Sequence, residues 1–133
     1  MNTFLPHPDY AISAAMLDNQ RLGKQRAEVK AIYEMCRNPR FATQPVVRTW
    51  RDHLWHLMAY GIACCDEWTK RGFEDNLKPF FEFVQRGLPQ GPKPEFSKLF
   101  HATMRANLIR KYPMFYSRYK WTEQPMEGYA WPA

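Results

Sequence analysis

The stretch Leu17-Asp18-Asn19-Gln20-Arg21-Leu22-Gly23-Lys24-Gln25-Arg26-Ala27-Glu28 is a charged segment inside a longer helical pattern. At about 100° per residue, two cations, an amide and a carboxylate fall on one face: Arg21, Lys24, Gln25 and Glu28. The turns that follow carry an apolar stripe at helical spacing, formed by Val29, Ile32, Tyr33 and Cys36. The pattern predicts a helix whose first half carries a site and whose second half packs into a core. The alternative is a solvated charged face with side-chain pairs three and four residues apart.

The composition limits the class of protein. A chain of 133 residues can bury one core without metals or disulfides, so we expect a monomeric single domain over residues 1–133. A net charge of +6 with 16% aromatic residues favours an anionic partner, and nucleic acid is the usual one. Three cysteines without paired spacing, Cys36, Cys64 and Cys65, indicate reduced thiols and the cytoplasm. No signal-peptide pattern is present and no apolar run reaches membrane length, so no membrane association is expected.

Proline and glycine divide the chain into helical segments. We expect helices over residues 10–36, 45–71, 76–85 and 95–111, a loop over 87–94 and an aromatic tail over 114–133. Asp9 is a candidate cap for the first helix, Leu17-Asp18 a candidate break within it, and Gly72 the expected end of the second. No convincing strand is present. The predicted fold is therefore all-α, with three main helices, several short helices, an extended N-terminus and an aromatic C-terminal tail.

The segment 95–111 also mixes core residues with charge. Residues within about 80° of one another on the expected inward face are His101, Met104, Arg105, Leu108 and Tyr112. The opposite side is expected to hold Thr103, Asn107, Arg110 and Lys111. Because burying an arginine without a partner is costly, Arg105 needs an acid or a wet cleft, and we expect Glu28 to be that acid. A purely structural Glu–Arg pair beside a satisfied histidine is the alternative.

Several motifs, taken in order, resemble the pyrimidine-dimer DNA glycosylase (endonuclease V) family. The resemblance is carried by His7-Pro8-x-Tyr10, by a basic first helix with Arg21 and Arg26, and by Glu67-Trp68-Thr69-Lys70-Arg71-Gly72-Phe73. The arginine-bearing third helix and the aromatic tail extend the likeness over nearly the whole chain. A phage and bacterial branch of the family is similar over Leu17–Gln25 and over Arg105–Pro113.

This resemblance implies a compact all-α protein that kinks duplex DNA, flips a base and cleaves the glycosidic bond. In the family, the N-terminal α-amine attacks C1′ of the sugar and forms a Schiff base. A glutamate beside an arginine in the first helix assists, and β-elimination then nicks the strand. The resemblance implies no cofactor.

Two positions depart from the family pattern. The residue at the expected glutamate position is Leu22, and the nearby carboxylates are Asp18 and Glu28. The residue after Met1 is Asn2, which is larger than methionine removal usually accepts, so the free amine could belong to either residue. Lys24 offers a second amine, but it would need a strongly lowered pKa to attack at neutral pH.

The remaining candidate residues suit DNA binding. Expected phosphate contacts come from Arg21, Lys24, Arg26, Arg105, Arg110 and Lys111. The tail interleaves rings and cations that could stack on bases: Tyr116, Arg118, Tyr119, Lys120, Trp121, Tyr129 and Trp131, of which about half should only close the core. The predicted pocket is lined by Arg21, Lys24, Gln25, Glu28, His101 and Arg105. His53 and His56 lie three residues apart without a third ligand, so no metal site is expected.

The sequence therefore predicts a glycosylase/AP lyase acting on damaged or modified bases in duplex DNA. Its expected catalytic residues are Met1, Asn2, Asp18, Arg21, Lys24 and Glu28. One alternative is a catalytically inactive module that binds distorted or modified DNA with the same surface. Another is the same fold acting on RNA or a nucleotide derivative.

Overall fold

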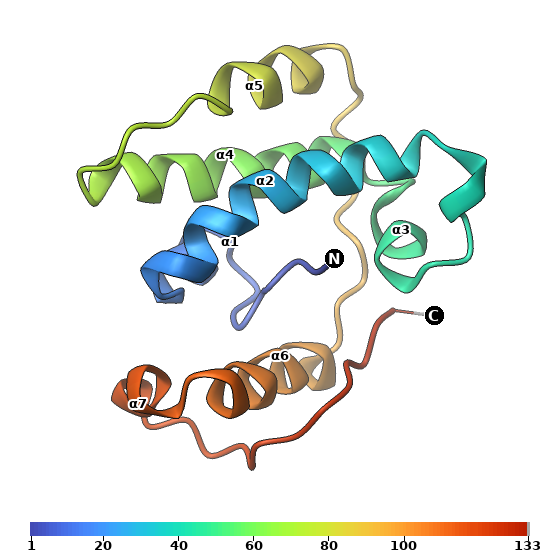
Figure 1. Ribbon diagram of the computed structural model, residues 1–133. Helices are drawn as coiled ribbons and strands as arrows, with labels where there is room; N and C mark the ends of the chain where they lie inside the picture. The colour runs from blue at the N-terminus through green and yellow to red at the C-terminus, as the bar shows by residue number, and fades with distance from the viewer. Residues whose placement is uncertain (133) are drawn as a thin grey trace.

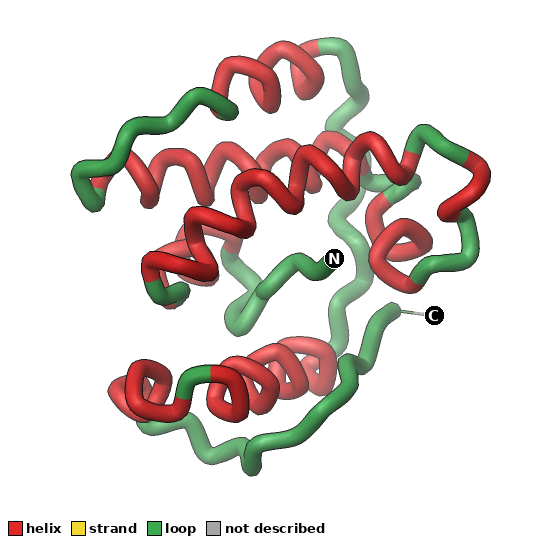
Figure 2. Tube along the Cα trace, viewed as in Figure 1, coloured by secondary structure: helices red, strands yellow, loops and turns green. Residues whose placement is uncertain are grey.

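The computed structural model describes residues 1–132, which form seven α-helices and two short 3-10 helices (Figures 1 and 2). The α-helices are α1 (Tyr10–Met16), α2 (Asn19–Cys36), α3 (Pro45–Trp50), α4 (Leu54–Lys70), α5 (Lys78–Arg86), α6 (Lys98–Lys111) and α7 (Pro113–Tyr116). The 3-10 helices are η1 (Pro39–Phe41) and η2 (Ser117–Tyr119). These residues contain no strand, and three helices are much longer than the rest, which confirms the predicted all-α class.

Side-chain caps set the beginnings of α1 and α2. The Asp9 carboxylate accepts a hydrogen bond from the Ile12 amide (2.9 Å), and the Asp18 carboxylate accepts one from the Arg21 amide (3.3 Å). Leu17 between the two helices is extended, with φ −77° and ψ 143°. The candidate break at Leu17-Asp18 is confirmed, since an aspartate cap satisfies amides that a new helix would otherwise leave unpaired.

The prediction of one helix over residues 45–71 is wrong. The chain turns between α3 and α4, where His53 has non-helical backbone angles (φ −138°, ψ 40°). The His53 ring also donates a hydrogen bond from Nδ1 to the Pro92 carbonyl (2.8 Å). The turn lets the buried Trp50 indole donate to the Thr3 hydroxyl (3.0 Å), a contact that apolar periodicity cannot reveal. The C-terminal end of α4 is where it was expected, because Gly72 follows the helix with a left-handed φ of +95°.

The two later helices begin further along the chain than their apolar patterns predict. Helix α5 begins at Lys78 and α6 at Lys98, instead of near residues 76 and 95. The start of α6 is decided by Ser97, whose hydroxyl accepts a hydrogen bond from the Phe100 amide (3.0 Å).

The N-terminal segment lies in the middle of the molecule. Helix α2 packs on α4, α4 also packs on α1 and α5, and residues 1–9 pass between this layer and α6 (Figure 1). The buried Tyr60 hydroxyl of α4 donates to the Phe4 carbonyl, while His101 of α6 donates from Nδ1 to the Leu5 carbonyl (2.7 Å). Leu5 is fully buried. The extended segment is therefore a core element that joins the helical layer to α6.

The C-terminal tail runs back along α6 (Figure 1). The Asn107 side chain donates to the Gly128 carbonyl (2.6 Å), and the Ala130 amide donates to the Thr103 hydroxyl (3.1 Å). Both α6 residues are buried, so the prediction that they lie on an outward face is wrong. Periodicity within a helix cannot reveal a face that a distant segment covers. Tail residue Ala133 lies outside the described residues.

Two further expectations concern the cysteines and the membrane. Cys36, Cys64 and Cys65 are all free, as their spacing predicts. None of the helices within residues 1–132 combines the length and the apolar character needed to cross a membrane.

Candidate active site at the N-terminus

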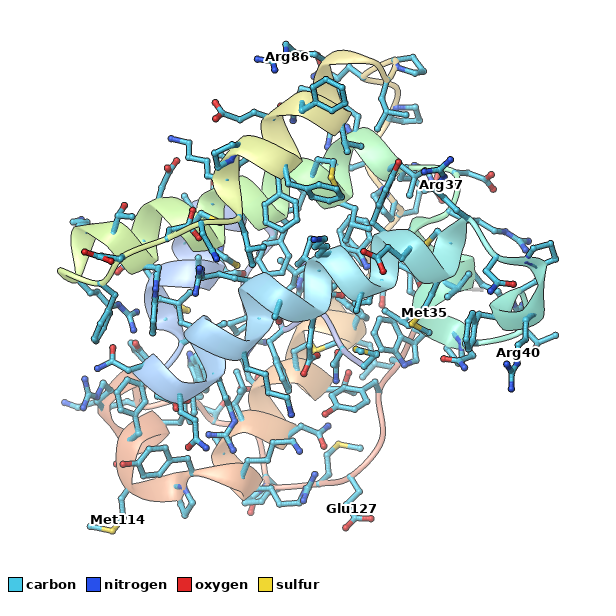
Figure 3. The ribbon with its side chains drawn as sticks, turned by 45° about the horizontal axis from the view of Figure 1, so that its top comes forward. Met35, Arg37, Arg40, Arg86, Met114 and Glu127 are labelled. Carbon is cyan, nitrogen blue, oxygen red and sulfur yellow. The ribbon has the colours of Figure 1, made fainter. Side chains whose placement is uncertain are left out.

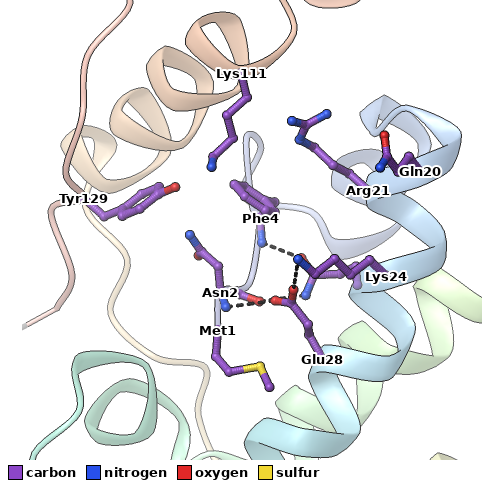
Figure 4. A pocket seen from close by; sticks show the side chains of 10 residues that line it. Met1, Asn2, Phe4, Gln20, Arg21, Lys24, Glu28, Lys111 and Tyr129 are labelled. Atoms are coloured by element: carbon purple, nitrogen blue, oxygen red, sulfur yellow. Dashed lines mark hydrogen bonds and ion pairs between the residues drawn. The ribbon is translucent and has the colours of Figure 1, made fainter.

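A pocket of about 390 Å³ opens where the N-terminus, α2, the end of α6 and the tail meet (Figure 4). Its lining residues are Met1, Asn2, Phe4, Gln20, Arg21, Lys24, Gln25, Glu28, Lys111 and Tyr129. The structure therefore brings together four of the six residues that were predicted to line a pocket. It adds the N-terminal residues to them, which is the arrangement needed for an amine to act there.

The carboxylate of Glu28 lies against the N-terminal backbone. Its Oε2 accepts a hydrogen bond from the Asn2 backbone nitrogen (3.0 Å), and its Oε1 lies 3.5 Å from the Lys24 ammonium. The Glu28 side chain is 14% exposed, while the Lys24 side chain is 74% exposed. Residues four apart share one face of a helix, so the spacing along α2 accounts for the Lys24–Glu28 pair. Only the tertiary fold places Asn2 beside it.

Gln25 fixes the course of the N-terminal segment. Its side-chain oxygen accepts from the Phe4 amide (2.7 Å), and its side-chain nitrogen donates to the Asn2 carbonyl (2.8 Å). The residue is almost completely buried. These two bonds hold residues 2–4 along α2, so Gln25 positions the Asn2 nitrogen against Glu28.

The pocket carries more positive than negative charge. Arg21 pairs with Asp18 (3.2 Å), whereas Lys111 forms no ion pair within residues 1–132 (Figure 4). Partial burial lowers the pKa of Lys111, and the neighbouring cations Arg110, Arg21 and Lys24 lower it further. A cluster of cations that lowers the pKa of Lys111 also attracts an anion, and a phosphate group would neutralise it.

Aromatic rings form the apolar part of the pocket. Phe4 and Tyr129 meet edge to face, with centroids 6.4 Å apart at an interplanar angle of 68°. Phe4 and Gln20 are not among the predicted site residues, whereas Tyr129 is one of the tail rings expected to stack on bases or close the core. Phe4 reaches the pocket because the N-terminal segment is internal, and Tyr129 because the tail returns along α6. The tail's mixture of rings and cations was the one signal in the sequence that pointed toward Tyr129.

The predicted pair between Glu28 and Arg105 is wrong. The Arg105 guanidinium instead binds Glu123 of the tail (3.0 Å) and donates to the Pro6 carbonyl (2.8 Å). Glu123 lies far from Arg105 along the chain, so the sequence alone did not indicate this pair. This guanidinium, through its hydrogen bond and its charge, holds the pKa of the Glu123 carboxyl below its usual value.

His101 and Arg105 do not line the pocket, contrary to the prediction. They contact the backbone of the N-terminal segment at Leu5 and Pro6, where His101 is buried and donates to the Leu5 carbonyl. Burial lowers the pKa of His101. Both side chains thus hold the segment from α6 without lining the pocket.

Arg26 and Asp18 also have structural partners. Arg26 is buried and binds Asp75 through Nε (2.9 Å) and Nη2 (2.5 Å), away from the pocket. Asp18 caps α2 and accepts a hydrogen bond from the buried Tyr116 hydroxyl (2.5 Å).

Of the tail cations, Arg118 lines a second pocket next to the first. Its lining includes Tyr112, Phe115, Arg118 and Tyr119, and Gln20 lines both pockets. Trp121 stacks on Tyr119, with centroids 5.0 Å apart, and both rings are half-buried. Lys120 is exposed, and the exposed Arg110 donates to the Met126 carbonyl (3.2 Å).

The two histidines considered for a metal have other partners. His53 and His56 donate to the carbonyls of Pro92 (2.8 Å) and Gly91 (3.1 Å). In the described part of the chain, no group of three metal-ligating side chains comes together.

The geometry defines an all-helical protein whose N-terminus ends in a cationic pocket containing a partly buried carboxylate. The model of the pyrimidine dimer DNA glycosylase family matches residues 1–79, and the chain belongs to this family. Membership indicates a glycosylase-like function on DNA and confirms the resemblance found in the sequence. The match includes α1 to α4, whereas Lys111 and Tyr129 lie beyond it. Comparison with curated proteins and with solved structures gives no match.

Proposed function

We propose that the protein is a DNA glycosylase and AP lyase whose nucleophile is the N-terminal amine and whose acid–base residue is Glu28. The observation that carries the proposal is the 3.0 Å contact between the Asn2 backbone nitrogen and Glu28 Oε2. If Met1 is removed, that nitrogen becomes the free amine and already contacts a carboxylate. A general base must lie within hydrogen-bond reach of the group that it serves, and Glu28 meets this requirement.

The reaction follows from this contact. The neutral amine forms a bond to C1′ of the target nucleotide, the glycosidic bond breaks, and the base leaves with the bonding electrons and a proton. Opening of the sugar ring gives a protonated imine. Loss of a proton from C2′ then expels the 3′ phosphate by β-elimination. Glu28 is the group in the pocket that can accept the amine proton and later exchange protons with the sugar.

The other pocket residues suit the substrate. Arg21, Lys24 and Lys111 would bind the phosphates beside the target nucleotide. Phe4 and Tyr129 offer ring faces to an extruded base. The reacting C1′ is inaccessible in a stacked duplex, so the nucleotide must leave the stack to enter the pocket.

Borohydride trapping tests the proposal. Reduction of the imine should link the protein covalently to duplex DNA that carries an abasic site or a pyrimidine dimer. Glu28→Gln should lower the rate of trapping by about 10²–10⁴-fold, the usual contribution of a general acid or base. Glu34→Gln is the matched control, since Glu34 is an exposed carboxylate on the same helix. A folded protein that gives no adduct on either DNA contradicts the proposal.

The mass of the intact protein decides which residue supplies the amine. Met1 lines the pocket and is 63% exposed, so a retained methionine would place the amine one residue further out. Blocking the amine by selective acetylation should abolish trapping in either case.

The second candidate function is DNA binding without catalysis. It is favoured by Leu22, a fully buried side chain that cannot move protons at the position where the family pattern has a glutamate. This candidate predicts salt-dependent binding that survives blocking of the amine, with no strand cleavage.

A further inference from the structure

The most exposed large apolar side chain within residues 1–132 is Met114, at 88% exposure. It stands at the start of α7 and points away from the molecule (Figure 3). Tyr112, two residues earlier, is 43% exposed. The segment between α6 and α7 therefore presents an apolar tip at the edge of the molecule.

The tip has a rigid support. Pro113 occupies the first turn of α7, and Tyr116 at its end is fully buried. The Tyr116 hydroxyl donates to Asp18 Oδ1 (2.5 Å) and accepts from the Asp18 amide (3.1 Å). Asp18 caps α2, the helix that carries Arg21 and Glu28. The tip and the N-terminal pocket are thus joined through one buried hydrogen-bonded pair.

Two cations lie close to the tip along the chain. Lys111, three residues before Met114, lines the N-terminal pocket, and Arg118 lines the second pocket. The Arg118 guanidinium lies over the Phe115 ring, 3.7 Å from its centroid. Neither Lys111 nor Arg118 has an acidic partner among the residues described. A surface that combines an apolar tip with unpaired cations complements duplex DNA, which has phosphates on its outside and stacked bases in its interior.

We propose that Met114 is a wedge that inserts into the base stack of duplex DNA beside the nucleotide held in the N-terminal pocket. The proposal rests on the proposed function. Extruding a nucleotide leaves a gap in the stack, and an apolar side chain that fills the gap stabilises the kinked duplex. Methionine suits this role, because its flexible thioether fills irregular spaces and contacts aromatic rings favourably.

The test compares Met114→Ala with Leu99→Ala in duplex binding. Leu99 is 64% exposed in the first turn of α6, so both variants remove an exposed apolar side chain without disturbing the core. The probe is a duplex with a stable abasic-site analogue and 2-aminopurine as its neighbour. Met114→Ala should weaken binding about tenfold, as expected for losing a buried methionine side chain, and should reduce the change in 2-aminopurine fluorescence. Leu99→Ala should change neither.

Salt dependence separates the wedge from a phosphate contact. Since Met114 carries no charge, the slope of log affinity against log salt should stay the same in Met114→Ala. The proposal is overturned if this variant binds within twofold of the wild type, or if its salt slope changes. It is also overturned if Met114 instead mediates a dimer, seen as concentration-dependent association of the wild type that Met114→Ala removes. If the wild type itself does not bind duplex DNA, the proposed function fails together with the wedge.

Discussion

Replacing Arg26 by methionine is expected to destabilise the fold by about 3–5 kcal/mol, the usual cost of removing one partner of a buried ion pair. The Arg26 side chain is 10% exposed and that of Asp75 is 3% exposed. Both Nε and Nη2 of Arg26 donate to Asp75 Oδ1, and the guanidinium also lies over the Trp68 ring (5.0 Å). Methionine keeps most of the apolar volume but leaves the buried carboxylate without its counter-charge.

The expected change in melting temperature follows from the size of the protein. An unfolding entropy of about 2.1 cal/mol/K per residue gives about 0.28 kcal/mol/K for this chain. A loss of about 3–5 kcal/mol therefore lowers the melting temperature by about 11–18 °C. Thermal unfolding and urea titration should agree on the loss of stability.

A double-mutant cycle completes the test. Asp75→Asn removes the charge of the partner, so Arg26→Met should cost much less in that background than in the wild type. DNA binding by the folded variant should keep its salt slope, because Arg26 lies away from the pocket. Unchanged stability together with a lower salt slope would refute this reasoning and make Arg26 a phosphate contact.

Three further substitutions test other contacts. Tyr116→Phe should destabilise the fold by about 1–2 kcal/mol in urea unfolding, because it removes the hydrogen bond to the buried Asp18 carboxylate. Lys111→Gln should lower the salt slope of duplex binding by about 0.9, the value for one phosphate contact, and an unchanged slope would exclude this role. Glu123→Gln tests linkage: Arg105 holds the pKa of Glu123 below 4.5, so the pair stabilises the fold above this pH. The stability gap between wild type and Glu123→Gln should therefore shrink as the pH falls through the folded pKa, and a gap that widens in acid would contradict the assignment.

Local chemistry made much of the helical structure predictable. The helix ends at Asp9, Asp18 and Gly72 were predicted correctly. Caps and left-handed turns depend on neighbouring residues, so the local sequence is enough to predict them. The break before Leu54 was not predictable, since the apolar spacing continues through it. The break accompanies the contact of Trp50 with Thr3, which no local rule contains.

The candidate site was predictable only in part. The shared face of Arg21, Lys24, Gln25 and Glu28 follows from helical geometry, and all four line the pocket. The assignment of Arg105 to Glu28 failed because several acids can satisfy one arginine, and only packing selects among them. Glu123 was selected because the tail folds back over α6.

The sequence by itself determined that the chain is helical, basic and a member of its family, because these properties reside in composition, local spacing and motif order. Only the tertiary structure decided that residues 3–6 run through the interior and that Asn2 lies against Glu28. It also decided that Lys111 and Tyr129 complete the same pocket. The physical reason is that an extended segment and a tail have no periodicity of their own, so their positions depend on the hydrogen bonds and packing that distant helices offer them.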